Sequence, residues 1–383
     1  MAIDLQELGY KLRRYRDQLK ESLEDVSRGT GIPSDRLAGI EEGSIRPSGD
    51  ELLILADHWA CDFQIFISDE DLAPFRDTDI LYRRHGNAFS KEDRRAVREF
   101  LYLCETESFL MAELGQESRE FSFSPVGSFY KGHAEEAAVA LRTFFGYETG
   151  RSAVPRNVFT DFRRIGVHVF RRQLQNSNIS GLFLSHIGAG PCLLVNYSED
   201  VYRQRFTAAH ELAHAIFDST QEAVVSFIRP KKNDLVEVRA NRFASCYLMP
   251  PSILANLPDP SKWPEAEAVR WANEFRVSCD ALGIALKEAG RASDATAQRI
   301  RNFRVPREAK IDPELGGKLS SKARENKQAL LQRGLSDFYA GLCFEAHDRG
   351  LISTGKLAEA ILADAAELPE MAELYGRSLR YGD

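Results

Sequence analysis

The first 67 residues alternate short apolar stripes with turn residues. Apolar side chains recur at helical spacing along the first stretch, at Leu5, Leu8, Leu12, Tyr15 and Leu19. This spacing predicts an amphipathic helix with one buried face. Gly29 and Gly31 then separate two further helices, of which the second starts near Ser34 and stops at Gly43. We expect a compact bundle of about five helices over residues 5–67.

A longer apolar stripe follows. Residues Lys91 to Leu114 predict one connecting helix, whose inward positions are Val97, Leu101, Cys104, Phe109 and Leu114. Residues 121–132 are rich in Ser, Gly and Pro, which is typical of a boundary between domains. A second domain is expected to begin near Ala134.

The pattern then changes to a helix, a small sheet and more helices. The predicted strands are Val167–Phe170, Gly181–His186 and Cys192–Asn196, and Gly188 to Pro191 supply a hairpin turn between the last two. The predicted helices are Ala134–Phe145, one ending at Asp161–Arg164, Tyr202–Phe217, Val236–Leu248, Trp263–Phe275 and Asp280–Ala289.

Beyond Gly290 the chain is charged and helical. Two periodic runs cover Ala329–Arg349 and Leu357–Leu374, and the basic residues between 299 and 310 are expected to form a solvated face. The fold class is therefore multidomain and mainly α with a small β-sheet. The expected domains are 1–70, a connector 71–130, an α+β domain 131–290 and a helical region 291–383, which could be a sensor, a lid or a dimerisation module.

Composition and charge limit the cellular compartment and the classes of partner that we expect for this protein. The six cysteines include no C-x-x-C pair, so neither a disulfide framework nor a cysteine-only zinc ribbon is indicated. No signal peptide begins the chain and no long apolar run could span a membrane. The formal net charge of −7 does not favour a general nucleic-acid binder. We expect a cytoplasmic protein with no membrane partner.

The residues His210-Glu211-Leu212-Ala213-His214 form an H-E-x-x-H motif in an apolar helix. Side chains four residues apart share one face of a helix, so both imidazoles can reach one cation. A hydrolytic zinc site uses three protein ligands, an open position for water and a carboxylate that takes the proton of that water. The motif supplies His210 and His214 as ligands and Glu211 as the base.

A third ligand is needed, and Glu237 is the strongest candidate because it begins the next predicted helix. Asp218, Glu222 and Asp234 compete for this role from the stretch between the helices. Asn241 lies one turn after Glu237, so it shares that face and could support a ligand histidine by a hydrogen bond.

Two linked motifs resemble the ImmA/IrrE family of zinc metallopeptidases. They are Arg205 to His214 and the E-x-x-A-N-x-F-A sequence from Glu237 that leads to Leu248-Met249-Pro250. The likeness covers roughly residues 131–290. It implies a zincin-like domain with His210, His214 and Glu237 as Zn²⁺ ligands and Glu211 as base. It also implies that the substrate is a partner transcription repressor.

A peptide substrate must lie extended beside the metal, and the strand from Gly181 could offer an edge for main-chain pairing. The candidate substrate-binding residues are Gly181, Leu182, Phe183 and Leu184. Four residues are open candidates for stabilising the oxyanion, namely His186, Tyr197, Tyr202 and Tyr247.

The N-terminal bundle resembles a Cro or XRE-type helix-turn-helix. In such domains the second helix of the motif enters the major groove with its N-terminal side chains, here Ser34, Asp35 and Arg36. Residues 1–70 carry eight Lys and Arg against fifteen Asp and Glu, a net charge of −7. Because phosphate binding needs cations, a helix-turn-helix protein partner or a homodimer is as plausible as DNA.

The first hypothesis is thus a regulatory zinc metallopeptidase that cuts a helix-turn-helix repressor during a stress, prophage or defence response. The alternative is a DNA-binding transcription regulator whose peptidase-like domain acts as a sensor. The complete H-E-x-x-H motif with Glu237 favours the enzyme, because a sensor has no need of the base Glu211.

Overall fold

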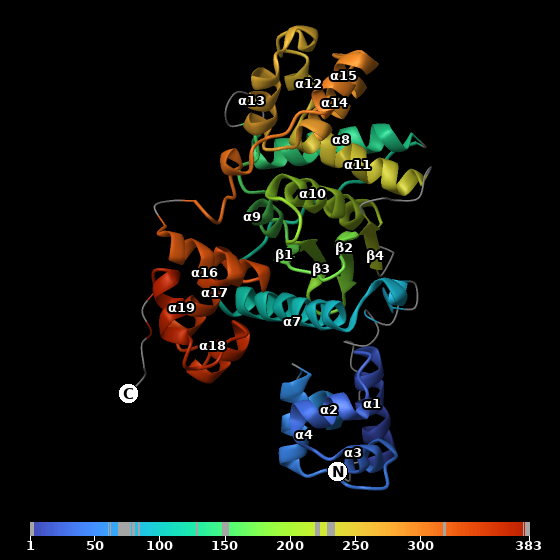
Figure 1. Ribbon diagram of the computed structural model, residues 1–383, viewed down its shortest axis with the longest axis vertical. Helices are drawn as coiled ribbons and strands as arrows, with labels where there is room; N and C mark the ends of the chain where they lie inside the picture. Colours follow the sequence, from blue (N-terminus) through green and yellow to red (C-terminus); the bar gives the residue numbers. More distant parts are fainter. Residues whose placement is uncertain are drawn as a thin grey trace. The chain divides into compact units, whose positions relative to one another are not determined.

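The computed structural model describes residues 4–59, 61, 63–67, 78, 81–82, 85–127, 129–147, 153–218, 223–227, 234–316, 319–377 and 379. The chain divides into two compact units. The first comprises Met1–Leu103 and Leu174–Asn176, and the second Cys104–Gln173 and Ser177–Asp383. The described residues are mainly helical, with one small mixed sheet (Figure 1). None of their helices is long and apolar enough to cross a membrane.

The first unit contains the predicted bundle of short helices. They are α1 (Leu5–Gln18), α2 (Leu23–Thr30), α3 (Ser34–Glu41), α4 (Gly49–His58) and α5 (Gln64–Ile67), followed by η1 (Gly86–Ala88). Ser22 and Ser48 begin α2 and α4 with capping boxes, and Gly31 ends α2 at a φ of 74°. These helices lie close to their predicted positions.

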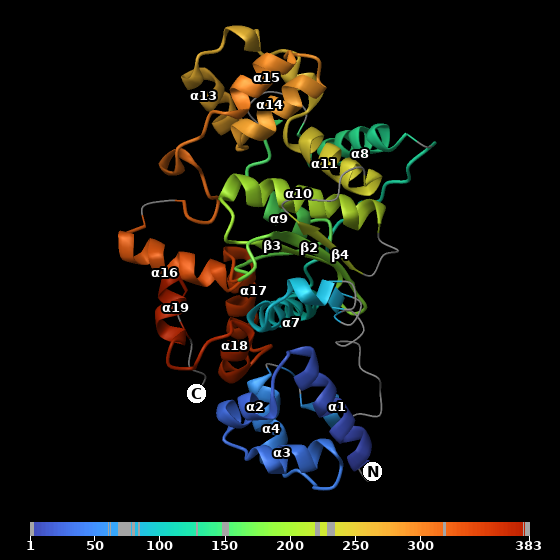
Figure 2. The same cartoon turned by 45° about the vertical axis from the view of Figure 1, so that its right-hand side comes forward.

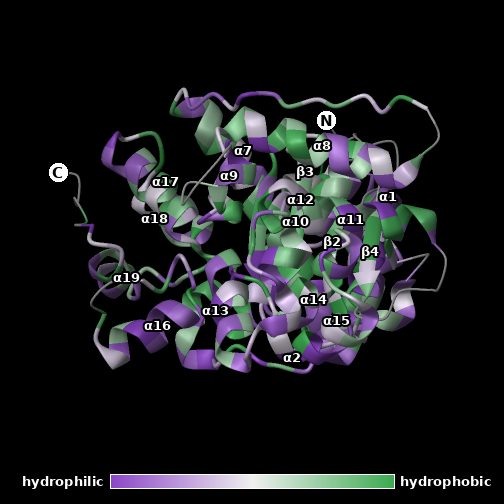
Figure 3. Cartoon of the chain, turned by 90° about the horizontal axis from the view of Figure 1, so that it is seen from above, coloured by the Kyte–Doolittle hydropathy of each residue, from purple (hydrophilic) through white to green (hydrophobic). Residues whose placement is uncertain are grey.

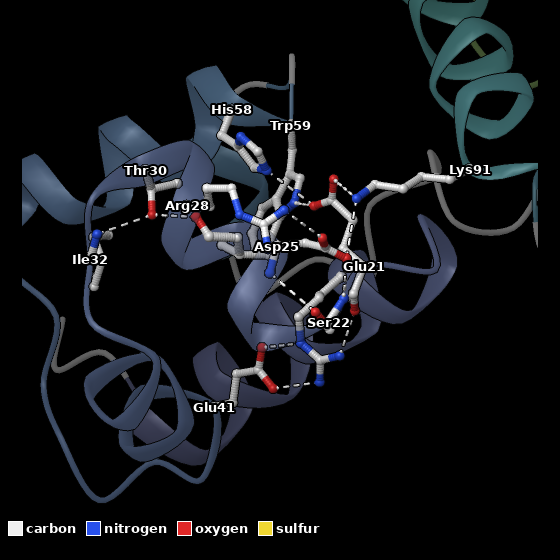
Figure 4. A network of polar contacts seen from close by, with 12 residues as sticks. Glu21, Ser22, Asp25, Arg28, Thr30, Ile32, Glu41, His58, Trp59 and Lys91 are labelled. Atoms are coloured by element: carbon white, nitrogen blue, oxygen red, sulfur yellow. Dashed lines mark hydrogen bonds and ion pairs between the residues drawn. The ribbon is translucent and has the colours of Figure 1, made fainter.

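Polar contacts around Glu21 tie the helices of this unit together (Figure 4). The Glu21 carboxylate lies 3.1 Å from His58 Nε2 and accepts a hydrogen bond of 2.9 Å from Trp59 Nε1. Lys91 Nζ lies 3.4 Å from the same carboxylate. Glu21 therefore joins the end of α1 to the end of α4 and to the start of the next long helix.

That helix is α7 (Lys91–Glu113), and its residues belong to the first unit up to Leu103 and to the second from Cys104. Val97, Leu101, Cys104 and Leu114 are buried as predicted. The prediction for Phe109 is wrong, because its side chain is 52% exposed. The inward stripe continues from Cys104 through Glu107 and Leu110, which leaves Phe109 on another face of the helix.

The sheet of the second unit has four strands in the order β1-β3-β2-β4. They are β1 (His168–Arg172), β2 (Ile179–His186), β3 (Gly190–Asn196) and β4 (Ala223–Phe227). β1 is parallel to β3, whereas β2 is antiparallel to both β3 and β4. The hairpin between β2 and β3 confirms the predicted turn, but β4 was not predicted.

Helix α10 (Val201–Phe217) packs against β2 and β3 on one face of the sheet, and α11 (Leu235–Leu248) and α8 (Tyr130–Phe145) lie beyond it (Figure 2). Alternate strand residues enter the core on this side, including Val169, Phe183 and Leu193. On the other face, His168 bonds Glu107 and Phe170 contacts Tyr339. Since both faces are covered, the strands are almost continuously apolar.

Further helices complete the core of this unit. They are α9 (Val158–Arg163), α12 (Pro251–Leu254), η3 (Pro260–Lys262), α13 (Glu265–Phe275), α14 (Cys279–Glu288) and α15 (Asp294–Arg301). The same hydrophobic core includes Ile300 and Val305, which lie beyond the expected boundary at residue 290. The core around α10 therefore extends into the region that follows.

The C-terminal helices are η4 (Arg307–Ala309), α16 (Ser321–Gln332), α17 (Asp337–Asp348), α18 (Thr354–Ala360) and α19 (Leu368–Leu374). Each of the two predicted periodic runs takes in residues of two helices. Gly334 at a φ of 96° divides the first and Leu362 at a φ of 52° divides the second. In Figure 3, α16 is largely hydrophilic whereas β2 and β3 are largely apolar.

Candidate metal centre

Helix α10 carries the H-E-x-x-H motif in the middle of the second unit. Asp200 caps the helix by accepting hydrogen bonds from the backbone N–H groups of Tyr202 and Arg203. Arg205 is fully buried and donates to the carbonyl groups of Pro155, Arg156 and Arg276, which anchors the helix. His210, Glu211 and His214 are consequently buried on a fixed element.

The structure brings His210, His214 and Glu237 to one point. The two Nε2 atoms of the histidines lie 3.2 Å apart. Glu237 Oε2 lies 3.3 Å from His210 Nε2, and Glu237 Oε1 lies 3.4 Å from His214 Nε2. Ligands bound at about 2.0–2.1 Å around a tetrahedral cation are separated by roughly 3.3–3.4 Å. The two imidazoles and the carboxylate thus converge as the ligands of one cation would, with each histidine nitrogen facing a different oxygen of Glu237.

The outer nitrogens of both imidazoles have hydrogen-bond acceptors. Asn241 Oδ1 lies 3.2 Å from His210 Nδ1, and Asp218 Oδ2 lies 3.0 Å from His214 Nδ1. These partners place the imidazole protons on Nδ1, so that the lone pairs of the two Nε2 atoms face one another. In that neutral tautomer the lone pairs beside the carboxylate repel one another, and a shared cation or a proton on His214 removes this repulsion.

The pKa shifts of Glu237 and His214 agree with this geometry. Burial alone would raise the pKa of Glu237, but the two imidazoles hold that pKa well below its ordinary value. Burial would likewise lower the pKa of His214, yet Asp218 and Glu237 raise it to about 9. Both shifts favour positive charge at the point where these side chains meet.

Glu211 is completely buried beside this cluster; neither carboxylate oxygen makes a hydrogen bond of normal geometry among the described residues, although the Ser226 hydroxyl lies close enough to lower the pKa of Glu211. Burial raises the pKa of Glu211, which the neighbouring imidazoles oppose. A buried carboxylate without a partner is costly. The burial of Glu211 fits a site in which a bound metal ion and its water molecule would contact this carboxylate.

A pocket of about 140 Å³ opens beside the cluster. Its lining combines His210, Glu237 and Asn241 with Ser180, Arg203, Phe206, Thr207, Ser226 and Phe227. The hydroxyl groups of Ser180 and Thr207 donate to Glu199, whereas the buried Ser226 hydroxyl lies near Glu211 and lowers the pKa of that carboxyl group. Sequence reasoning missed Ser226 and Phe227 because it missed β4.

The expectation that β2 offers an edge to a peptide is wrong. Leu182, Phe183 and Leu184 pair with β3 on one side and with β4 on the other, and Gly181 is likewise paired on both sides. The main-chain groups of this strand are therefore used within the sheet. The outer strand on the side of the pocket is β4, whose Ser226 and Phe227 line it.

The other described residues that the sequence offered as metal ligands or oxyanion stabilisers do not join the cluster of His210, His214 and Glu237. Asp218 contacts the outer nitrogen of His214, Asp234 caps α11, and Glu222 lies outside the described residues. None of His186, Tyr197, Tyr202 and Tyr247 lines the pocket. Tyr202, for example, donates to Asn273, and His186 accepts from the N–H groups of Gly188 and Ala189.

In the first unit, the three candidate DNA-binding residues begin α3. Asp35 is exposed, and the Ser34 hydroxyl lies 3.5 Å from the carbonyl oxygen of Leu23. Arg36 donates to both carboxylate oxygens of Glu51, at 2.5 and 2.9 Å. The guanidinium group that could read a guanine is therefore occupied by an acidic side chain of its own domain.

Residues 162–287 match the family model of peptidase family M78, described as the IrrE N-terminal-like domain. The matched IrrE-like region contains the sheet, α10 and α11, and so every residue of the candidate metal centre. It makes up about a third of the chain. No curated protein matches the chain. The match supports a regulatory function of the metallopeptidase-like ImmA/IrrE type.

Proposed function

We propose that this protein is a zinc-dependent regulatory peptidase that hydrolyses a peptide bond in a protein partner. The observation that carries the proposal is the convergence of two imidazoles and one carboxylate: the Nε2 atoms of His210 and His214 lie 3.2 Å apart, and they lie 3.3 and 3.4 Å from the Oε2 and Oε1 atoms of Glu237, respectively. Two imidazoles and one carboxylate are a common zinc donor set in hydrolytic sites, with the fourth position left for water or substrate.

When bound, zinc would supply the Lewis acidity that polarises the scissile carbonyl and the attacking water. Glu211 is the base in this scheme, since it takes the proton of the water and passes it to the leaving amine. Its burial raises its pKa, so the carboxylate accepts that proton more readily than an exposed glutamate would. A sensor would need the ligands but not this buried base.

The substrate would lie along β4. This strand ends the sheet, and its other side has no paired strand among the described residues. An extended peptide added there continues the antiparallel pairing and passes the pocket lined by Ser226, Phe227 and Glu237. Backbone pairing does not depend on the side chains of the peptide. In this scheme the pocket and the first unit therefore supply the selectivity for the substrate.

The partner in this scheme is a transcription repressor with a helix-turn-helix domain. The first unit would recognise this repressor. Residues 1–70 carry a net charge of −7, which disfavours binding to the phosphates of DNA, and Arg36 is paired with Glu51. We place the protein in the cytoplasm, where it would act in a stress, prophage or defence response. DNA binding through residues 1–70 and a homodimer are the alternatives, which a mobility-shift assay and a measurement of the oligomeric state would test.

The test compares the full chain with Glu211→Gln. Both proteins are loaded with zinc and incubated with the candidate repressor encoded beside the gene, and cleavage is followed by mass spectrometry. We expect one internal cut by the wild type and none by the variant, with equal zinc content. Equal cutting by Glu211→Gln would remove Glu211 as the base, and the absence of any cut in either would contradict the peptidase function.

A further inference from the structure

Arg239 lies two residues after Glu237 on α11 and is buried at the back of the metal centre. Its Nη2 donates to Asp218 Oδ1 at 2.6 Å. The second oxygen of the same carboxylate lies 3.0 Å from His214 Nδ1. Arg239, Asp218 and His214 thus form one continuous chain of charged contacts that ends at a candidate metal ligand.

The guanidinium group of Arg239 is also held by aromatic rings. Its Cζ atom lies 4.5 Å from the ring centroid of Phe217 and 5.1 Å from that of Tyr130. Phe217 ends α10 and Tyr130 begins α8, so three helices define the position of this one group. The Asp218 carboxylate therefore meets a donor whose place is set by the surrounding packing.

This arrangement is not the most stable one for a buried arginine. The Nε atom of Arg239 is buried and has no hydrogen-bond partner among the described residues. A buried donor left unpaired costs free energy. An apolar side chain of similar length would avoid that cost but would take from the Asp218 carboxylate its contact with a cation, so the contribution of this arginine lies in its hydrogen bond to Asp218.

We propose that Arg239 is a positioning residue of the metal centre, which acts on His214 through Asp218. Fixing both oxygens of Asp218 keeps the carboxylate turned toward His214 Nδ1. The imidazole is then held in one orientation, with Nε2 directed at the metal position. Loss of Arg239 lets Asp218 rotate away and weakens metal binding. The inference rests on the proposed zinc site.

The chain offers a matched control in Arg242. This residue lies one turn further along α11 and its side chain is 10% exposed, against 9% for Arg239. It pairs with Glu135 of α8 and Glu288 of α14, and none of these residues belongs to the metal centre. Replacing Arg242 removes a buried arginine from the same helix without touching Asp218.

The experiment measures zinc affinity of the full chain by competition with a chromophoric chelator, for the wild type, Arg239→Met and Arg242→Met. Outer residues of this kind change metal affinity by about 10–100-fold. We expect Arg239→Met to bind zinc at least about tenfold more weakly, and Arg242→Met to bind as the wild type does. The visible spectrum of bound cobalt(II) should change only in Arg239→Met.

Three outcomes decide the inference. Wild-type affinity and an unchanged cobalt spectrum in Arg239→Met would overturn it and leave the zinc site standing. Equal weakening in both variants would also overturn it, since α11 would then merely have loosened. A wild type that binds no zinc would contradict the proposed function itself. If Arg239→Met does not fold, Arg239→Lys is measured beside Arg242→Lys, and equal affinities overturn the proposal.

Discussion

A Cβ atom on Gly181 would lie 2.9 Å from Glu211 Oε1. It would also lie 2.7 Å from Thr207 Cγ2 and 2.9 Å from the carbonyl oxygen of Leu194, which is backbone and cannot yield. The missing side chain of Gly181 therefore makes the space that the base occupies. We expect Gly181→Ala to displace Glu211 and to lower kcat by about 100-fold, the effect of a misplacement near 1 Å.

The control for this variant is Gly188→Ala in the β2–β3 turn. A Cβ atom there would meet only His186 atoms, at 3.6 Å and beyond, which is an ordinary contact. Cleavage of the partner by Gly188→Ala should match the wild type. If Gly181→Ala also cleaves at the wild-type rate, the close approach of Gly181 to Glu211 has no part in catalysis.

Removal of the metal should lower the stability of the second unit. A ligand that binds only the folded chain adds about 2.7 kcal/mol when its concentration is 100 times the Kd. We expect chelation to lower the Tm of the wild type and zinc to restore it. The Tm of His214→Ala should respond to neither treatment. A zinc-dependent Tm in that variant would show that zinc binds elsewhere.

Arg171 of β1 holds the region after α15 to the sheet. Its guanidinium donates to both oxygens of Asp312, at 2.8 and 3.1 Å, and lies 3.5 Å from Glu314. Removing one member of a buried ion pair costs about 3–5 kcal/mol, because the partner charge is left uncompensated. Urea unfolding of Arg171→Met should show a loss of this size, and Glu314→Gln should recover part of it.

The stability contributed by the Arg36–Glu51 pair should depend on pH. Arg36 lowers the pKa of Glu51 to about 2, below the ordinary value of 4.5. Because the pKa of Glu51 is lower in the folded chain than in the unfolded chain, the ionised carboxylate stabilises the fold above pH 4.5. This contribution is lost as the pH falls toward 2. The Tm difference between wild type and Glu51→Gln should therefore be largest near neutral pH and shrink in acid. A difference that grows in acid would contradict the pairing.

The helices around the metal centre could be predicted because their apolar spacing is regular and their ends carry cap residues. His210, Glu211 and His214 share a face by helical geometry alone, and Glu237 follows at the start of the next helix. The structure shows that these side chains converge and that Asn241 contacts His210. Their roles in binding and catalysis remain predictions.

Strand pairing could not be predicted in the same way. β4 is five residues long, and its sequence AVVSF is as compatible with a short buried helix as with a strand. Without β4, β2 looked like an edge, and Gly181 to Leu184 were assigned to the substrate. The role of Asp218 was equally hidden, because the contact with Arg239 joins two helices whose packing the sequence does not reveal.

The most direct test of the account is the zinc content of the purified full chain, measured by elemental analysis. We expect one zinc ion per chain in the wild type and in Glu211→Gln, and almost none in His210→Ala, His214→Ala or Glu237→Ala. A full zinc complement in the ligand variants, or no zinc in the wild type after loading, would contradict the metal centre on which the proposed peptidase function depends.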